Sequence, residues 1–166
     1  GIENEIKINS RVLLGGDLEL STRNEALDLN LLDKLKEEFF LTKVIEFTSI
    51  MRTKNEKSKT IRVKVIDSSY PLVGNVIVEP PNSLQILKTK PNSILIDRTT
   101  QTNLDLQLGE RIKIQNSEFE VIGVIESLPD IGGAFLFGDQ ALINESSFKD
   151  LKIDNLGSFF IFKYKL

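Results

Sequence analysis

Residues 104–143 read LDLQLGERIKIQNSEFEVIGVIESLPDIGGAFLFGDQALI, and this stretch defines the central β unit of the chain. Apolar and polar residues alternate on both sides of a polar turn, a pattern that predicts two short antiparallel strands. Pro129 and several glycines then end the alternation, and apolar side chains continue into a loop at Phe135, Leu136 and Phe137. The stretch therefore predicts a small β unit with an apolar loop, and it contains no constellation of catalytic residues.

The composition is that of one folded domain or of two small interlocked lobes. The chain has 166 residues, of which 40% are hydrophobic and 27% charged, and its net charge of −3 gives no electrostatic argument for a nucleic-acid partner. Histidine and cysteine are both absent, which excludes a Ser-His-Asp triad, a histidine-ligated zinc site and a disulfide within the chain. We expect no catalytic residue, metal site or cofactor in this domain.

Both ends of the chain lack the features of natural termini. The chain starts in a helical pattern without a cap and ends in an apolar strand pattern over residues 158–166, whereas free-standing proteins usually taper into polar residues. No run approaches the roughly 18 to 20 apolar residues of a transmembrane helix. We therefore expect the chain to be a soluble piece of a longer protein.

The order of elements predicts an α+β fold. Loosely spaced apolar residues predict a helix near the start that stops at Gly15-Gly16, and amphipathic spacing predicts another over residues 29–39. The secondary structure of residues 83–90 is ambiguous from the pattern. A short helix is predicted over 146–151, with Asn144 or Ser146 as its cap. Extended segments are predicted for residues 17–21, 42–53, 60–67, 76–78, 93–97 and 159–164, with a short helix over 98–103.

This order suggests a βαβ-like lobe built from both ends of the chain, with a β-rich lobe inserted over residues 72–141. We expect the linkers between the lobes near residues 68–74 and 139–144. Tyr70, Pro71 and Gly74 are the candidate hinge residues, because a Tyr-Pro corner is rigid and a glycine is conformationally free.

No motif for phosphate binding or hydrolysis is present, since neither glycine-dense stretch continues into a phosphate-binding pattern. A hydrolase that uses two carboxylates stays open as a remote alternative. Alternation along strands favours a solvated acidic face for the acids concerned, which are Asp97, Asp105, Glu110, Glu126 and Asp130.

Basic residues gather along the hairpin predicted from residues 42–67. We interpret them as the solvated face of this hairpin, with a binding patch as the alternative. The cluster comprises Arg52, Lys54, Lys57, Lys59, Arg62 and Lys64.

The aromatic residues of the glycine-rich loop leave two interpretations open. Phe135 and Phe137 either anchor the loop inward or, together with Leu136, form a contact surface for a partner. The loop 129–138 is the candidate contact surface.

Several segments in order resemble one known family. They are GGDLELS at 15–21, YPLVG at 70–74, ILID at 94–97, LQLGERIKI at 106–114, FEVIGVI at 119–125, PD at 129–130 and LGS at 156–158. This series is similar to the extracytoplasmic, or periplasmic core, domain of MacB/FtsX-type ABC transporter permeases, closest to the YbbP-like branch. ESLPD at 126–130 departs from that branch, which tends to have Glu-Pro-Asp there.

The resemblance implies a specific architecture. It implies a Porter-like α+β lobe of residues 1–71 and 142–166, with residues 1–16 as a helical extension from a preceding transmembrane helix. It implies an inserted, Sabre-like β-rich lobe of residues 72–141. Transmembrane helices on both sides would hold the domain at the outer face of the inner membrane.

The resemblance also implies a function. A cytoplasmic ATPase subunit hydrolyses ATP, and the permease, expected to be dimeric in full length, transmits this motion across the membrane. The domain would be a non-catalytic coupling element in transport or extraction. The alternative is a periplasmic module that binds a lipid, a lipoprotein or another amphiphilic or protein partner.

Overall fold

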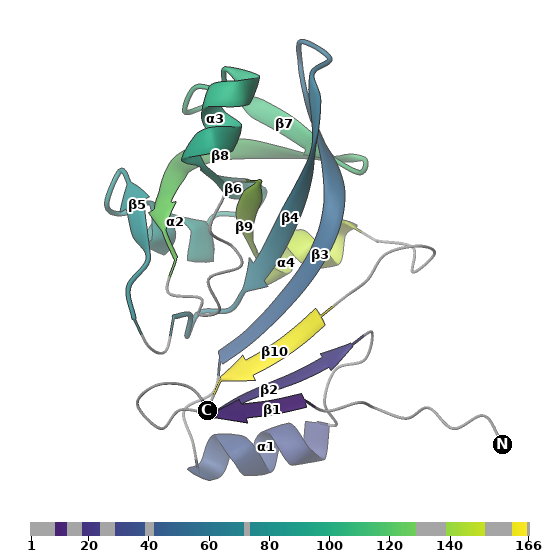
Figure 1. The fold of residues 1–166 in the computed structure, drawn as a ribbon, viewed down its shortest axis with the longest axis vertical. Coiled ribbons are helices and arrows are strands. Elements are labelled where there is room, and N and C mark those ends of the chain that lie inside the picture. Colours follow the sequence, from purple (N-terminus) through teal and green to yellow (C-terminus); the bar gives the residue numbers. More distant parts are fainter. Residues whose placement is uncertain are drawn as a thin grey trace, which may run out of the picture.

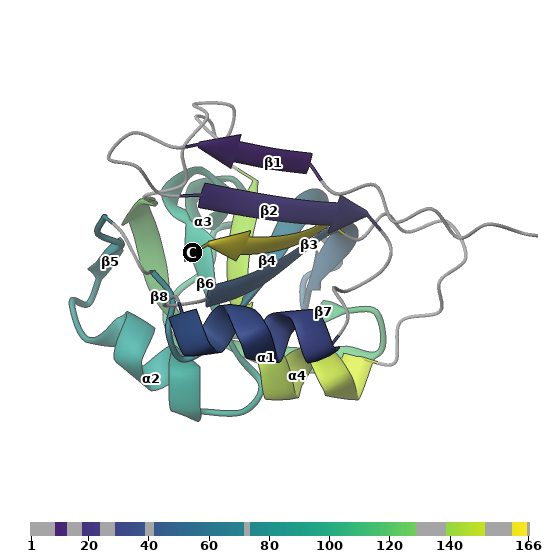
Figure 2. The ribbon, with the colours of Figure 1, turned by 90° about the horizontal axis from the view of Figure 1, so that it is seen from below.

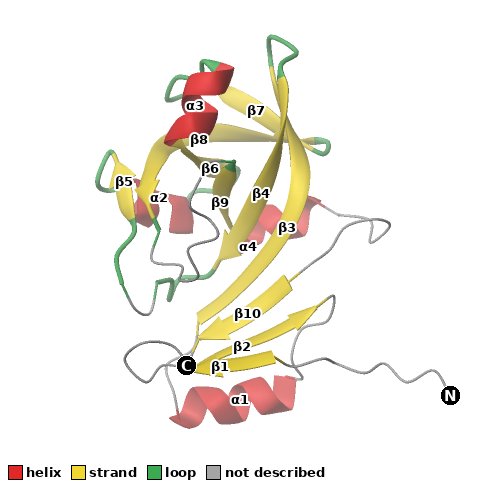
Figure 3. Ribbon diagram, in the orientation of Figure 1, coloured by secondary structure: helices red, strands yellow, loops and turns green. Residues whose placement is uncertain are grey.

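The computed structural model describes residues 9–12, 18–23, 29–38, 42–71, 74–128, 139–151 and 161–165. These ranges form four short helices and ten strands, and all ten strands belong to one sheet (Figures 1 and 3). None of the described helices has the length and hydrophobicity that a bilayer-spanning helix needs. The elements are β1 (Asn9–Val12), β2 (Leu18–Arg23), α1 (Leu29–Glu38), β3 (Thr42–Thr53), β4 (Ser58–Ile66), β5 (Ile77–Glu79), α2 (Ser83–Thr89), β6 (Ser93–Asp97), α3 (Arg98–Leu104), β7 (Arg111–Ile114), β8 (Ser117–Ser127), β9 (Gln140–Asn144), α4 (Glu145–Leu151) and β10 (Ile161–Lys165).

Six of these strands close into a barrel. The hydrogen-bonded pairs run β3–β4, β4–β9, β9–β6, β6–β8 and β8–β7, and β7 pairs back onto β3 through the partners Met51 and Ile114. Because the ring is closed, each of its strands is paired on both sides. This closure protects a sheet against pairing with other chains. We refer to these six strands as the barrel.

The barrel interior is one hydrophobic cluster to which every barrel strand contributes. Side chains alternate along a strand, so the odd positions of β3 and β4 point inward and the even positions point outward. Leu104 at the end of α3, Leu106 after it, and Phe148 and Leu151 of α4 extend the cluster. The strand residues of the cluster are Ile45, Phe47, Met51, Ile61, Val63, Val65, Ile94, Ile96, Ile112, Ile114, Phe119, Val121, Ala141 and Ile143.

A second hydrophobic cluster covers the outside of the barrel, where α2 packs on β6, β8 and β9. Leu84 and Leu87 of α2 meet Leu95 and Leu142 in this cluster. Gly123 of β8 permits the close approach, because a Cβ atom there would lie 2.5 Å from Ser83 Oγ. The helix at residues 83–89 resolves the ambiguous prediction for this segment.

The remaining strands form a separate layer. β1, β2 and β10 pair antiparallel, and β10 continues the ladder onto the first half of β3, with Phe162 opposite Ile45. Figure 2 shows these strands side by side, with α1 running alongside them. We refer to β1, β2 and β10 as the terminal layer. It joins the first and last described strands of the chain.

The predicted α+β class is confirmed, together with the hairpin over residues 42–67 and the β unit of β7 and β8. The predicted helical extension over residues 1–16 is wrong for Asn9–Val12, which form β1. Val12 pairs with Leu18, and Asn9 with Ser21. The apolar spacing there was too loose to specify a helix, and Asn and Ser have low helix propensity, so pairing with β2 prevails.

The predicted linker near residues 139–144 is also wrong over Gln140–Asn144. These residues form β9, which is buried along its whole length in the centre of the sheet between β4 and β6. The short apolar run Ala141–Ile143 is typical of a strand covered on both faces. The division into lobes at 71/72 and 141/142 stays a prediction, and strands from both segments share the barrel.

Asn144, at the end of β9, fastens three elements together. Its Nδ2 donates to the carbonyl oxygens of Leu87 (2.8 Å) and Lys90 (2.9 Å), and its Oδ1 accepts from the Ser147 N–H (2.8 Å) at the start of α4. Asn144 is thus the helix cap, one of the two residues predicted for that role. The Ser146 hydroxyl donates to the same Oδ1 (3.0 Å).

Replacing Asn144 by alanine should lower the free energy of unfolding by about 2–4 kcal/mol, because the buried Leu87 carbonyl and the partly buried Lys90 carbonyl each lose a donor and α4 loses its cap. Urea denaturation measures this change. Ser146→Ala is the control, since Ser146 is exposed and loses one bond, with an expected effect below about 1 kcal/mol. Equal effects of the two substitutions would contradict the fastening role of Asn144.

Candidate functional site

The corner after β4 is held by one carboxylate. Asp67 Oδ1 accepts from the Thr42 hydroxyl (2.6 Å) and the Ser69 N–H (3.0 Å), and Oδ2 accepts from the Lys43 N–H (2.8 Å). Thr42 and Lys43 begin β3, whereas Ser69 lies in the turn after β4. Hydrogen bonds to a charged acceptor are stronger than neutral ones, so Asp67 ties the start of β3 to this turn.

The predicted hinge residues follow this corner and differ from one another. Tyr70 is 2% exposed, and its side chain belongs to the outer cluster with Val44 and Ile66. Its N–H donates to the Asp67 carbonyl (3.3 Å), and Pro71 is half-buried. Gly74 is exposed and has a φ of +79°, in the region that favours glycine. Tyr70 is therefore anchored and Gly74 is the freer position, while their action as a hinge stays a prediction.

A buried pair of opposite charges lies where the terminal layer meets the barrel. Glu46 and Lys64 are register partners on β3 and β4, with Lys64 Nζ 3.8 Å from Glu46 Oε1. Their side chains are only 7% and 3% exposed. Removing one partner would leave a buried charge without compensation, which is strongly destabilising. The pair therefore reinforces the register of β3 and β4.

The acids considered for hydrolysis do not share a site. Asp97 is 9% exposed, so the predicted solvated face is wrong for this residue. It caps α3 by accepting from the N–H and hydroxyl of Thr100, and it also accepts from the Gln140 N–H (2.9 Å). A cap and a link between β6 and β9 are structural tasks.

The other acids have separate surroundings. Glu126 pairs with Arg98, and Glu110 accepts from the Gln107 N–H (3.0 Å). Asp105 is exposed, at the left-handed residue that ends α3, and Asp130 lies outside the described residues. Within the described ranges, no group of three or more acids is arranged to hold a metal ion.

The candidate contact residues Phe135, Leu136 and Phe137 also lie outside the described residues, so their role stays a prediction. Surface clefts among the described residues include three with volumes of about 380, 450 and 550 Å³. Most of the residues that line them are polar or charged.

The basic residues of the hairpin fall into two groups. Arg52, Lys54, Lys57 and Arg62 are exposed, as the interpretation of a solvated face predicts. Lys64 is 2% exposed, and the interpretation is wrong there, because Glu46 faces it from the neighbouring strand. Lys59 is paired with Asp139 (2.6 Å).

Sequence reasoning missed Asp67 and the pair of Glu46 with Lys64. The pair could have been found by extending the hairpin register from the polar turn, since Glu46 and Lys64 then face each other. The same register, extended one step beyond Val44 and Ile66, places Asp67 opposite Lys43, whereas the bond to the Thr42 hydroxyl, 25 residues away, leaves no signal in the pattern.

Replacing Asp67 by alanine should lower the free energy of unfolding by about 1–3 kcal/mol, because three donors lose a charged acceptor at a half-buried corner. The amides of Lys43 and Ser69 should exchange their hydrogens faster, which NMR measures. Asp150→Ala, at an exposed position of α4, is the matched control. Unchanged exchange at both amides would show that Asp67 does not hold the corner.

Comparisons with known proteins agree with this fold. The family model of the MacB-like periplasmic core domain matches residues 4–162. The "Uncharacterized ABC transporter permease YbbP" of Escherichia coli (strain K12) is 24% identical over 131 residues, which are 79% of this chain and 16% of that protein. The chain therefore spans a small part of this curated relative.

Two solved structures are similar in fold. The periplasmic region of MacB from Actinobacillus actinomycetemcomitans has a TM-score of 0.55 at 15% identity, over 82% of this chain and 64% of that chain. The extracellular domain of the noncanonic ABC-type transporter YknZ from Gram-positive bacteria has a TM-score of 0.57 at 14% identity, over 81% of this chain and 72% of that chain. Since the family model covers nearly the whole sequence, the chain belongs to the family of MacB-like periplasmic core domains.

Proposed function

We propose that this domain is a non-catalytic coupling element of an ABC transporter permease. It would carry motion driven by a cytoplasmic ATPase to the outer face of the membrane, where transport or extraction takes place. Membership in the MacB-like family and the similarity to the permease YbbP support this proposal.

The observation that carries the proposal is the course of β3. Its first residues pair with β10 of the terminal layer, and its later residues pair with β4 and β7 of the barrel. A continuous hydrogen-bonded strand transmits displacement along its length better than a flexible linker does. Movement of the terminal layer would therefore reach the tip of the β3–β4 hairpin.

Two contacts at the crossing support the same proposal. Asp67 ties the start of β3 to the turn after β4, and the buried pair of Glu46 and Lys64 fixes the register of the two strands. Gly74 follows this fixed corner. A hinge between parts of the domain would therefore lie after Tyr70, towards Gly74.

The alternative of a periplasmic binding module requires a site for an amphiphile. The residues that line these three clefts are mainly polar or charged, which does not favour an apolar ligand. A carboxylate-dependent hydrolase requires convergent acids, whereas Asp97 and Glu126 each serve a separate structural contact. Coupling is the better supported function.

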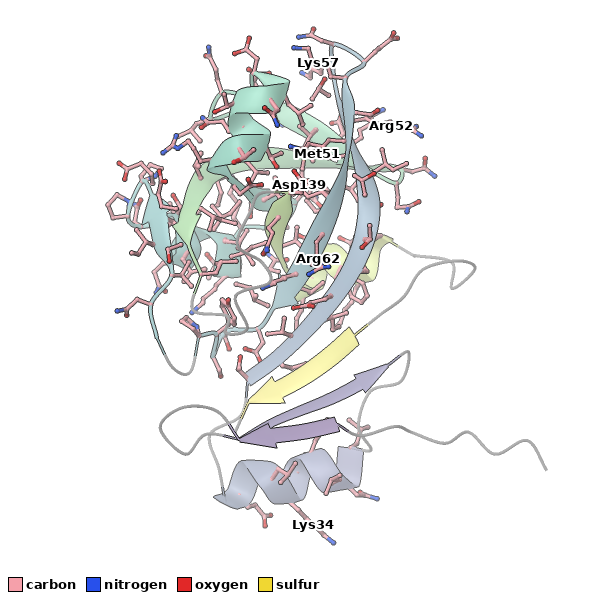
Figure 4. The ribbon with its side chains drawn as sticks, in the orientation of Figure 1. Lys34, Met51, Arg52, Lys57, Arg62 and Asp139 are labelled. Carbon is pink, nitrogen blue, oxygen red and sulfur yellow. The ribbon has the colours of Figure 1, made fainter. Side chains whose placement is uncertain are left out.

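Fluorescence energy transfer in the full-length permease tests the coupling proposal. A donor dye at Lys57→Cys, on the hairpin tip, is combined with acceptor lipids in a nanodisc that also holds the partner ATPase (Figure 4). This sequence has no cysteine, so the domain carries the dye at a single position. Trapping the ATPase with nucleotide should change the transfer efficiency, because the displacement travels along β3 to the tip.

A dye at Lys34→Cys on α1 serves as the matched position beside the terminal layer, and it should respond under the same conditions. An ATPase variant unable to bind nucleotide should abolish both responses. Transmission through β3 would be refuted if, in a preparation that hydrolyses ATP, the transfer efficiency changed for the dye at position 34 and not for the dye at position 57. Responses at neither position would refute the coupling role itself.

A further inference from the structure

The tip of the β3–β4 hairpin and the neighbouring β7 enclose a cationic cleft of about 550 Å³. Arg52 and Lys54 line it from the end of β3 and the following turn, and Arg111 and Lys113 line it from β7. All four residues are exposed, and Figure 4 shows Arg52 directed away from the body of the molecule. We refer to these four residues and the space between them as the cationic cleft.

The barrel holds these cations in place. Arg52 pairs in register with Lys113, one step from the pair of Met51 and Ile114. Met51 and Ile114 are both 0% exposed, inside the barrel. A slip of either strand by one residue would turn its cation, Arg52 or Lys113, into the interior, so the register is strongly specified. Arg52, Arg111 and Lys113 are therefore fixed on one outer face of two adjacent strands, and Lys54 follows in the turn.

The arrangement is electrostatically unfavourable in the absence of a counter-charge. Like charges directly opposite on neighbouring strands are destabilising, and Arg52 faces Lys113. Two acids line the cleft. Glu118 lies 3.5 Å from Arg111 and is the register partner of Lys113 on β8, and Glu56 belongs to the turn. Four cations against two carboxylates leave a formal charge of +2 in a chain whose net charge is −3.

Some other cations of the domain have acidic partners. Lys90 pairs with Glu120 (2.9 Å) and Lys59 with Asp139 (2.6 Å). Within the described part of the chain, by contrast, Arg52, Lys54 and Lys113 make no ion pair. Among the described residues, Lys34, Lys57, Arg62, Lys88 and Lys149 also make none, but the cleft is where three such cations line one space.

We propose that the cationic cleft binds a phosphate group, carried either by a lipid headgroup or by a small soluble ligand. Arginine presents a planar fork of donors that matches phosphate oxygens, and lysine adds a mobile point charge. A phosphate group offers several acceptor oxygens to donors converging from two strands, and the Ser58 hydroxyl also lines the cleft. The proposal is independent of the coupling role.

Two binding measurements on the 166-residue chain test the site. The first is an NMR titration with inorganic phosphate, with sodium chloride adjusted to keep the ionic strength constant. The second is flotation with phosphatidylcholine vesicles that contain either phosphatidylglycerol or oleate, at matched negative surface charge. Saturable shifts of the amides of Arg52, Arg111 and Lys113, or preferential flotation with phosphatidylglycerol, are the expected results.

The variant Arg52→Gln/Lys113→Gln should weaken this binding at least about tenfold, because it removes two charge-assisted contacts. Its thermal unfolding midpoint should be unchanged or higher, because repulsion between opposed cations is relieved. The control Lys34→Gln/Lys149→Gln makes the same change in net charge at two exposed positions on other elements. It should retain binding within about twofold.

The two sources of phosphate are distinguished by competition. Displacement from vesicles by millimolar inorganic phosphate assigns the site to soluble phosphates, whereas flotation that resists this competitor assigns it to the lipid headgroup. The proposal would be overturned if both double variants weakened binding equally. It would also be overturned if vesicles with oleate floated the protein as well as those with phosphatidylglycerol, or if chloride alone caused the same amide shifts as phosphate. The absence of binding in both assays would overturn it as well.

Discussion

The fold depends on the pairing of a single strand, β3. It is twelve residues long, and its partners change along its length from β10 to β7 while β4 accompanies most of it. The pairing with β7 closes the barrel, and the pairing with β10 attaches the terminal layer. No other described strand belongs to both parts of the sheet.

Closure of the barrel has consequences for the helices and for the surface. The inward side chains fill the barrel, so α2 packs against the outward side chains of β6, β8 and β9. The same alternation places Met51 inside and Arg52 outside at the hairpin tip. The interior packing thereby fixes which charges face solvent at the cationic cleft. Stability and surface chemistry are linked through one strand register.

The buried polar groups stand where distant segments of the chain meet. Asn144 binds α2 to β9, Asp97 binds β6 to β9, and Asp67 binds the start of β3 to the end of β4. Asp97 and Asn144 satisfy buried backbone groups, and Asp67 satisfies backbone groups at a half-buried corner. A domain fastened in this way is suited to pass on displacement as a unit, in agreement with the proposed coupling role.

Local patterns were sufficient to predict much of this fold. The β-branched run of β3, the alternation in β4 and the apolar spacing of α1 are properties of contiguous residues. The resemblance to the permease family also came from short ordered segments. Asn144 was a predicted cap because it precedes a helical pattern, yet its bonds to Leu87 and Lys90 join residues 57 and 54 positions apart.

The features that local patterns did not predict depend on distant pairing. β9 reads as a short apolar run, and only its neighbours β4 and β6 identify it as a central strand. Barrel closure requires β7 to reach β3, about sixty residues earlier in the chain. The opposition of Arg52 and Lys113 follows from this closure and leaves no signal in either local sequence. The aromatic loop and the lobe boundaries remain predictions.

Native-state hydrogen exchange along β3 tests most directly whether this strand unites the terminal layer and the barrel. Amides of Thr42–Thr53 are followed by NMR at increasing, sub-denaturing concentrations of urea. If β3 makes one cooperative unit, the amides bonded to β10 and those bonded to β4 and β7 converge on the same opening free energy and the same urea dependence. Amides of the first half that open at a separate, lower free energy with little urea dependence would contradict a continuous connection through β3.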